Sequence, residues 1–161
     1  MRAMERNEQL MNTVRDIHLP RYWEIPTVGL YLEQVTRYVN AYLKKLGCPT
    51  ITASMVSNYV KQKTIPGPVK KAYGPASIAN LMYVALVKNV LSMEDIRLLE
   101  RQGLEQYEPQ QAYNYFCDEF ENVLELVERM TKQTYAEVNN RLLNDTKYEL
   151  QYLLMRKEQI N

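Results

Sequence analysis

The sequence lacks acidic side chains over a long internal stretch. Residues 34–93 contain no Asp or Glu, although they hold eight Lys and Arg. Residues 94–161 hold fourteen acidic and eight basic residues, and residues 1–33 hold five and four. The formal net charge of +1 therefore hides a basic middle and an acidic C-terminal third. A basic surface attracts polyanions such as nucleic acids, whereas the alternative interpretation is that the two parts of the chain attract each other.

Long apolar runs are also missing. The longest, Leu81–Val87, is far shorter than the roughly 20 residues of a membrane-spanning helix. The first eight residues lack the apolar segment of a secretory signal, and two Cys do not make a disulfide framework. We therefore expect a cytoplasmic protein without a membrane partner.

The usual groups of catalysis are scarce. The chain has one His and two distant Cys, which offer no metal-ligand spacing. The glycine-rich nucleotide motifs and the nucleophile motif of hydrolases do not occur. We expect no enzyme, no cofactor and no metal.

Apolar residues recur at helical spacing through most of the chain, which predicts an all-α, mostly helical fold. Thr27, Thr52 and Ser92 are the expected N-caps, while Gly47 and Gly103 are expected where helices end. All five Gly and all seven Pro lie at or before Pro109. The predicted helices cover residues 3–17, 28–46, 53–63, 75–90, 93–102, 110–133 and 134–158.

The segment between the third and fourth of these helices is rich in turn residues. Pro66-Gly67 is a turn signal, and Pro75 suits the first position of the following helix. The segment is long enough for a small two-stranded wing over residues 66–74.

The short helix 53–63 carries the most specific chemistry. Val56 and Tyr59 are expected to face inward, while small and polar side chains face outward. Ser54 and Ser57 are short enough to let the backbone approach DNA, and Asn58 can bond adenine in a bidentate way. A helix N-terminus, here capped by Thr52, directs N–H groups at phosphate. Phosphate contacts are predicted for Lys61, Lys63, Lys70 and Lys71.

These residues resemble a known pattern. The run from Thr52 to Pro66 resembles the second helix of the MerR-like helix-turn-helix, and Lys70–Ile78 resembles the basic wing of that family. The run Val90–Leu99 is similar to its short helix opened by Ser. Residues 25–36 are similar to a bacterial family of unknown function, whose members are small predicted MerR-like DNA-binding proteins. The resemblance covers about residues 22–102.

The resemblance implies a winged helix-turn-helix in which helix 53–63 is the recognition helix. By position, Ser54, Ser57, Asn58 and Lys61 match its contacting face. Lys70, Lys71 and Tyr73 match the wing. The implied division is an N-terminal helix and linker (1–21), a winged helix-turn-helix domain (22–103) and a helical region for dimerisation or effector binding (104–161).

The C-terminal region carries a long apolar stripe with acidic residues beside it. A stripe of this kind is typical of a core or of an interface between subunits. We therefore predict a DNA-binding transcriptional regulator that acts on double-stranded DNA as a homodimer, with residues 104–161 as the candidate site for a small-molecule or protein effector. The alternative is a protein-interaction module on the same fold, working through residues 110–161.

Overall fold

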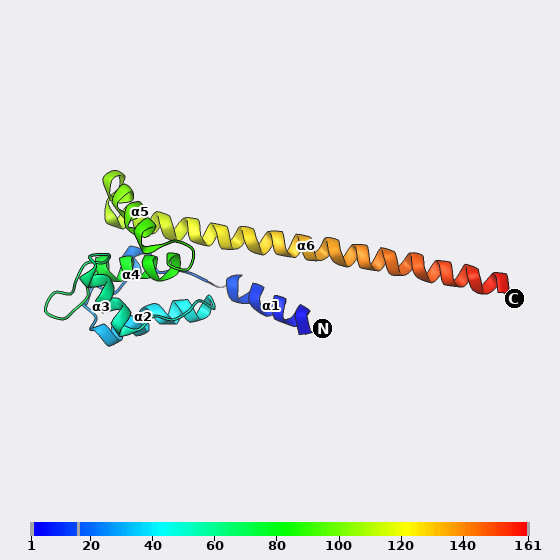
Figure 1. Cartoon of the computed structure of the whole chain (residues 1–161), viewed down its shortest axis with the longest axis horizontal. Coiled ribbons are helices and arrows are strands. Elements are labelled where there is room, and N and C mark those ends of the chain that lie inside the picture. The colour runs from blue at the N-terminus through cyan, green and yellow to red at the C-terminus, as the bar shows by residue number, and fades with distance from the viewer. Residues whose placement is uncertain (1, 16, 161) are drawn as a thin grey trace. The chain divides into compact units, whose positions relative to one another are not determined.

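The computed structural model describes residues 2–15 and 17–160. The chain is mostly helical, as predicted, and no strand occurs in this described part. Two compact units are separable, one ending at Val123 and the other beginning at Leu124. The elements in Figure 1 are α1 (Arg2–Arg15), the 3₁₀ turn η1 (Tyr22–Glu24), α2 (Leu32–Lys45), α3 (Ala53–Lys61), α4 (Pro75–Val87), α5 (Met93–Gln106) and α6 (Pro109–Ile160).

The core of the first unit surrounds α4. This helix buries residues on all sides, and α2 packs against both α3 and α4. Pro75 occupies its first turn, where a missing N–H costs nothing. The helix predicted over 75–90 is thus the central, buried helix of this unit, although it ends three residues early, at Val87. Fully buried side chains include Val35, Val39, Leu43, Val56, Ile78, Leu81, Met82, Val84, Ile96 and Cys117.

Several predicted caps are confirmed. The side chain of Thr52 accepts a hydrogen bond from the Met55 N–H at 3.2 Å, and that of Ser92 accepts one from Asp95 at the same distance. Gly47 has φ +68, the left-handed conformation that favours glycine after a helix.

The predicted start of the second helix was wrong. Thr27 is not an N-cap, because α2 begins at Leu32 with Tyr31 as its N-cap. The reason lies in Leu30, whose N–H donates to Tyr73 O at 3.0 Å and whose carbonyl accepts from Tyr73 N at 2.7 Å. An extended residue bonded in this way is not free to join a helix. Gly29 permits this approach, because an added Cβ would lie 2.6 Å from the Ala72 Cβ.

The other helix boundaries also needed correction. The helix predicted over 93–102 runs to Gln106, since Gly103 is tolerated inside α5 and the chain turns only before Pro109. The helices predicted over 110–133 and 134–158 are one helix, α6 (Figure 1). Residues 110–161 contain no Gly or Pro, so nothing in the sequence breaks it. The third helix ends at Lys61 rather than at residue 63, and the first ends at Arg15, with residue 16 outside the described residues.

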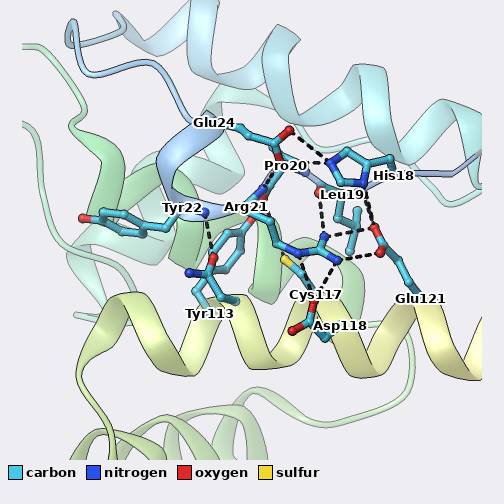
Figure 2. A network of polar contacts seen from close by, with 11 residues as sticks. His18, Leu19, Pro20, Arg21, Tyr22, Glu24, Tyr113, Cys117, Asp118 and Glu121 are labelled. Carbon is cyan, nitrogen blue, oxygen red and sulfur yellow. Dashed lines mark hydrogen bonds and ion pairs between the residues drawn. The ribbon is translucent and has the colours of Figure 1, made fainter.

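A buried arginine holds the segment before η1 against the first turns of α6 (Figure 2). The Arg21 side chain is only 11% exposed. Its Nη1 and Nη2 donate to the two oxygens of Glu121 at 3.0 and 2.6 Å, and its Nε donates to Asp118 at 3.1 Å. Nη1 also donates to the Leu19 carbonyl at 2.8 Å. We call this cluster the Arg21 clamp.

The surrounding backbone depends on the same clamp. Glu121 Oε1 also accepts from the Leu19 N–H at 2.8 Å. The buried Tyr113 hydroxyl donates to the Pro20 carbonyl at 2.6 Å. Burial alone would raise the pKa of Glu121, but the hydrogen bonds from Arg21 and Leu19 leave that pKa below its ordinary value. The hydrogen bonds of the clamp thus favour the charged form of the Glu121 carboxyl group.

Replacing Arg21→Ala should lower the free energy of unfolding by about 3 kcal/mol, because it leaves the Glu121 charge partly buried without its partner. Urea unfolding followed by circular dichroism measures this. Arg101→Ala, on the exposed face of α5, is the control and should change stability by less than about 0.5 kcal/mol. Equal effects of the two variants would contradict a structural role for the clamp.

A second carboxyl group, that of Glu100 in α5, is partly buried without a hydrogen bond to one of its oxygens. Its Oε1 is buried and has no hydrogen-bond partner among the described residues. Burial raises the pKa of Glu100 to about 7, although the charge of Arg97 opposes the shift. The folded chain therefore holds a proton at Glu100 at pH values where the unfolded chain has released it.

This shift predicts a pH-dependent stability. The contribution of Glu100 to stability falls as pH rises from about 4.5 through about 7 and is constant above that. Glu100→Gln imitates the protonated form. The variant should match the wild type near pH 4.5 and exceed it at pH 8 by roughly 1–2 kcal/mol, since the side chain keeps some contact with water. Urea unfolding at the two pH values tests this, and a constant difference would contradict it.

Candidate nucleic-acid interface

The connection between α2 and α3 is fixed by an asparagine. The Asn40 side chain donates to the Ile51 carbonyl at 2.9 Å and accepts from the Ile51 N–H at 2.8 Å. After α2, Cys48 N–H bonds Leu43 O at 2.9 Å, which closes the helix end around Gly47. α2 and α3 therefore form two helices joined by a short, rigid turn.

One face of α3 is buried and the other is open. Val56 and Tyr59 are 0% and 8% exposed, as the sequence predicted. Ser54, Asn58 and Lys61 are exposed and lie three or four residues apart, on the opposite face. Ser57 is half-buried beside them, and exposed Thr52 uses its hydroxyl as the N-cap.

The C-terminal end of α3 is fixed by α5. Arg97 donates to the Thr64 hydroxyl at 3.3 Å and to Gln62 Oε1 at 3.2 Å. Between them, exposed Lys63 has φ +58. The loop that follows is held by Ser77, whose hydroxyl donates to the Pro66 carbonyl at 2.8 Å. An added Cβ on Gly67 would lie 3.2 Å from Val60 of α3, so the loop runs directly against the helix.

The loop then turns sharply. Val69 and Ala72 form an antiparallel bridge, with N–H to carbonyl distances of 2.9 and 3.0 Å. The two residues between them, Lys70 and Lys71, have φ 49 and φ 66 and are exposed. Positive φ at both central residues is the pattern of a type I′ hairpin turn, which favours Asn-Gly. We call residues 69–72 the lysine hairpin.

Lys63, Lys70 and Lys71 share an unusual property. They are the non-glycine residues with positive φ among the described residues. For a lysine this conformation costs on the order of 1 kcal/mol, and Gly or Asn would relieve it. The Lys63 N–H donates to the Val60 carbonyl at 3.0 Å, but none of the three lysine side chains makes a hydrogen bond or an ion pair within the described part of the chain. Strain of this kind is typical of functional positions.

Tyr73 differs from the other candidates. It is 5% exposed and belongs to the core, while its backbone pairs with Leu30. Its side chain therefore positions the lysine hairpin from beneath and offers little surface to a ligand.

Two features escaped the sequence prediction because each joins distant segments. The Arg21 clamp joins residues 19–21 to residues 118–121. A shallow groove of about 520 Å³ brings Asn58 of α3 and Gln62, the residue after α3, beside Lys88. The one available signal was Lys88 itself, the last base of the acid-free stretch.

Metal-ligand clusters and membrane-spanning helices were both sought among the described residues. They contain no group of three or more His, Cys, Asp or Glu side chains placed to hold a metal ion. None of the helices in this part of the chain combines the length and the apolar character that crossing a bilayer requires.

The comparisons with known proteins give one match. Residues 20–116 match the model of a family described as DUF1836, a domain of unknown function. The match includes α2 to α5 and the lysine hairpin, and it ends within the first turns of α6. No curated protein and no solved structure matches the chain.

Replacing Lys70→Asn together with Lys71→Gly should raise the free energy of unfolding by about 1 kcal/mol, because the new residues suit a type I′ turn. Urea unfolding is the measurement. Lys70→Ala is the control, since it removes one charge but keeps the strained backbone, and it should leave stability nearly unchanged. A less stable double variant would mean that the lysine side chains contribute to the fold itself.

Proposed function

The chain belongs to the DUF1836 family, and we propose that it is a DNA-binding transcriptional regulator. The proposal is supported above all by one observation: strained, exposed lysines follow a short helix whose open face is small and polar. Residues 34–93, which contain this arrangement, hold no acidic side chain to repel a phosphate. Such an arrangement suits a polyanion with grooves.

In the proposed mode, α3 enters the major groove. Ser54 and Ser57 allow the helix backbone to approach the base edges. Asn58 is exposed and can bond the N6 and N7 of adenine. Because α3 contains no Arg, the proposal assigns it no bidentate guanine contact.

In this mode four lysines hold phosphates. Lys61 lies in the last turn of α3 and Lys63 just beyond it, while Lys70 and Lys71 form the tip of the lysine hairpin. The hairpin would act as the wing of a winged helix-turn-helix. These four contacts fix the position of the helix on DNA rather than the sequence that it reads.

The proposal includes a homodimer formed through α6. Beyond Val123 this helix exposes apolar side chains along most of its length, and apolar surface of this extent gains free energy when it is covered. A two-fold dimer presents two recognition helices to two half-sites. The exposed apolar residues are Val123, Leu126, Val127, Met130, Val138, Leu142, Leu143, Tyr148, Leu150, Tyr152, Leu153 and Met155.

The direct test is an anisotropy titration against duplex DNA, of random sequence and from the genome of origin, at about 50 and 200 mM salt. Four phosphate contacts predict a log–log salt slope of about −3.6 per subunit, since each contributes roughly −0.9. A dimer doubles this slope. Lys61→Glu with Lys71→Glu should abolish binding and leave the circular dichroism spectrum unchanged.

The matched control reverses two charges elsewhere, Arg101→Glu with Lys147→Glu, both exposed. It should bind DNA like the wild type. Equal binding by the two double variants would refute the assigned interface. Absence of DNA binding by the wild type at the lower salt would refute the proposed function.

A second candidate function is a protein-interaction module built on the same fold. The exposed apolar residues of α6 favour it, because they offer a surface to another protein as readily as to a second copy. Partner binding that does not depend on Lys61, Lys63, Lys70 and Lys71 would support this function over DNA binding.

A further inference from the structure

A groove lies between α3 and the connection from α4 to α5. Its volume of about 520 Å³ falls within the range of small-molecule sites, roughly 300–1,000 Å³. It is open to solvent along one side.

The lining combines an apolar floor with a polar edge. Met55 and Tyr59 of α3, together with Leu91 and Met93, are its apolar lining residues. Methionine side chains are flexible and polarisable, so they adapt to planar or aliphatic groups. Asn58 adds an exposed amide that makes no hydrogen bond within the described part of the chain.

Lys88 gives the groove its charge. It is the one cation of the lining, and no acidic residue lines the groove. Glu94 and Asp95 follow in the first turn of α5 and are exposed. Burial lowers the pKa of Lys88, which means that its ammonium group has lost part of its water. An anion in the groove would restore the lost stabilisation.

We propose that this groove binds a small organic anion, with its apolar body against Met55 and Met93 and its charged group on Lys88. Occupation of the groove would cover Asn58, which the proposed function assigns to DNA. The ligand and DNA would then compete. The competition rests on the proposed function, whereas the binding of the anion does not.

The first test uses a fluorescent probe of this chemistry, 8-anilinonaphthalene-1-sulfonate, beside its uncharged analogue N-phenyl-1-naphthylamine. Lys88→Met should raise the dissociation constant of the sulfonate about five- to tenfold and change that of the neutral probe by less than about twofold. Lys61→Met, on the exposed face of α3, is the matched control and should change neither. Equal sulfonate binding by the Lys88 variant and the wild type would overturn the proposal.

The second test locates the probe, because apolar residues of α6 also offer it a surface. In ¹³C-methyl spectra of methionine-labelled protein, the sulfonate should shift the Met55 and Met93 resonances, which are assigned with Met→Leu variants. Shifts confined to Met130 or Met155 of α6 would overturn the site.

A final measurement adds duplex DNA to the complex with the probe. Loss of the bound sulfonate from Met55 and Met93 supports competition at one surface. If the sulfonate stays while DNA binds, the competition is refuted and α3 is not the helix that reads DNA, yet the anion site stands. If DNA does not bind at all, the proposed function fails, and the Lys88 and methionine results alone decide the groove.

Discussion

The arrangement of the first unit depends on the burial of one guanidinium group. Arg21 is nearly enclosed, and a buried cation is tolerated only where acceptors surround it. Glu121, Asp118 and the Leu19 carbonyl supply those acceptors. Because two of them come from α6, the first turns of that helix must lie against the segment before η1. The base of α6 is thereby joined to the same core that supports α3, so the first turns of α6, up to Val123, belong to the same compact unit as the proposed recognition helix.

The lysine hairpin shows a different constraint, because its backbone conformation lowers the free energy of unfolding. Lys70 and Lys71 occupy a turn for which Asn-Gly is better suited, and neighbouring Lys63 has the same left-handed backbone. The surrounding structure forces these conformations: Tyr73 is buried and paired with Leu30, and Ser77 holds the loop at Pro66. On the proposed function, a requirement for positive charge at the hairpin tip accounts for lysines at positions where Asn and Gly would relieve the strain.

Much of the fold was predictable because its signals are local. The caps Thr52 and Ser92, the glycine after α2 and the buried periodicity of α4 depend on residues a few positions apart. The failures were of two kinds. The start of α2 was predicted too early because Leu30 pairs with Tyr73. No residue near Leu30 in the sequence indicates this pairing. Helix ends were also predicted where none occurs: Gly103 lies inside α5, and α6 continues through residues 133–134, because no Pro enforces an end there. The open face of α3 was predicted from periodicity, whereas the groove at Lys88 and the Arg21 clamp require knowledge of the packing.

The acidic side chains of residues 94–161 are concentrated in the first half of that segment. Residues 94–125 hold nine acidic and two basic residues, whereas residues 126–161 hold five and six. The excess negative charge therefore belongs to α5 and the first turns of α6, where the Arg21 clamp neutralises part of it. On the proposed function, phosphates attract the basic residues 34–93 and repel the acidic side chains of residues 94–125. This difference disfavours encounters with DNA in which the first turns of α6 face the phosphates.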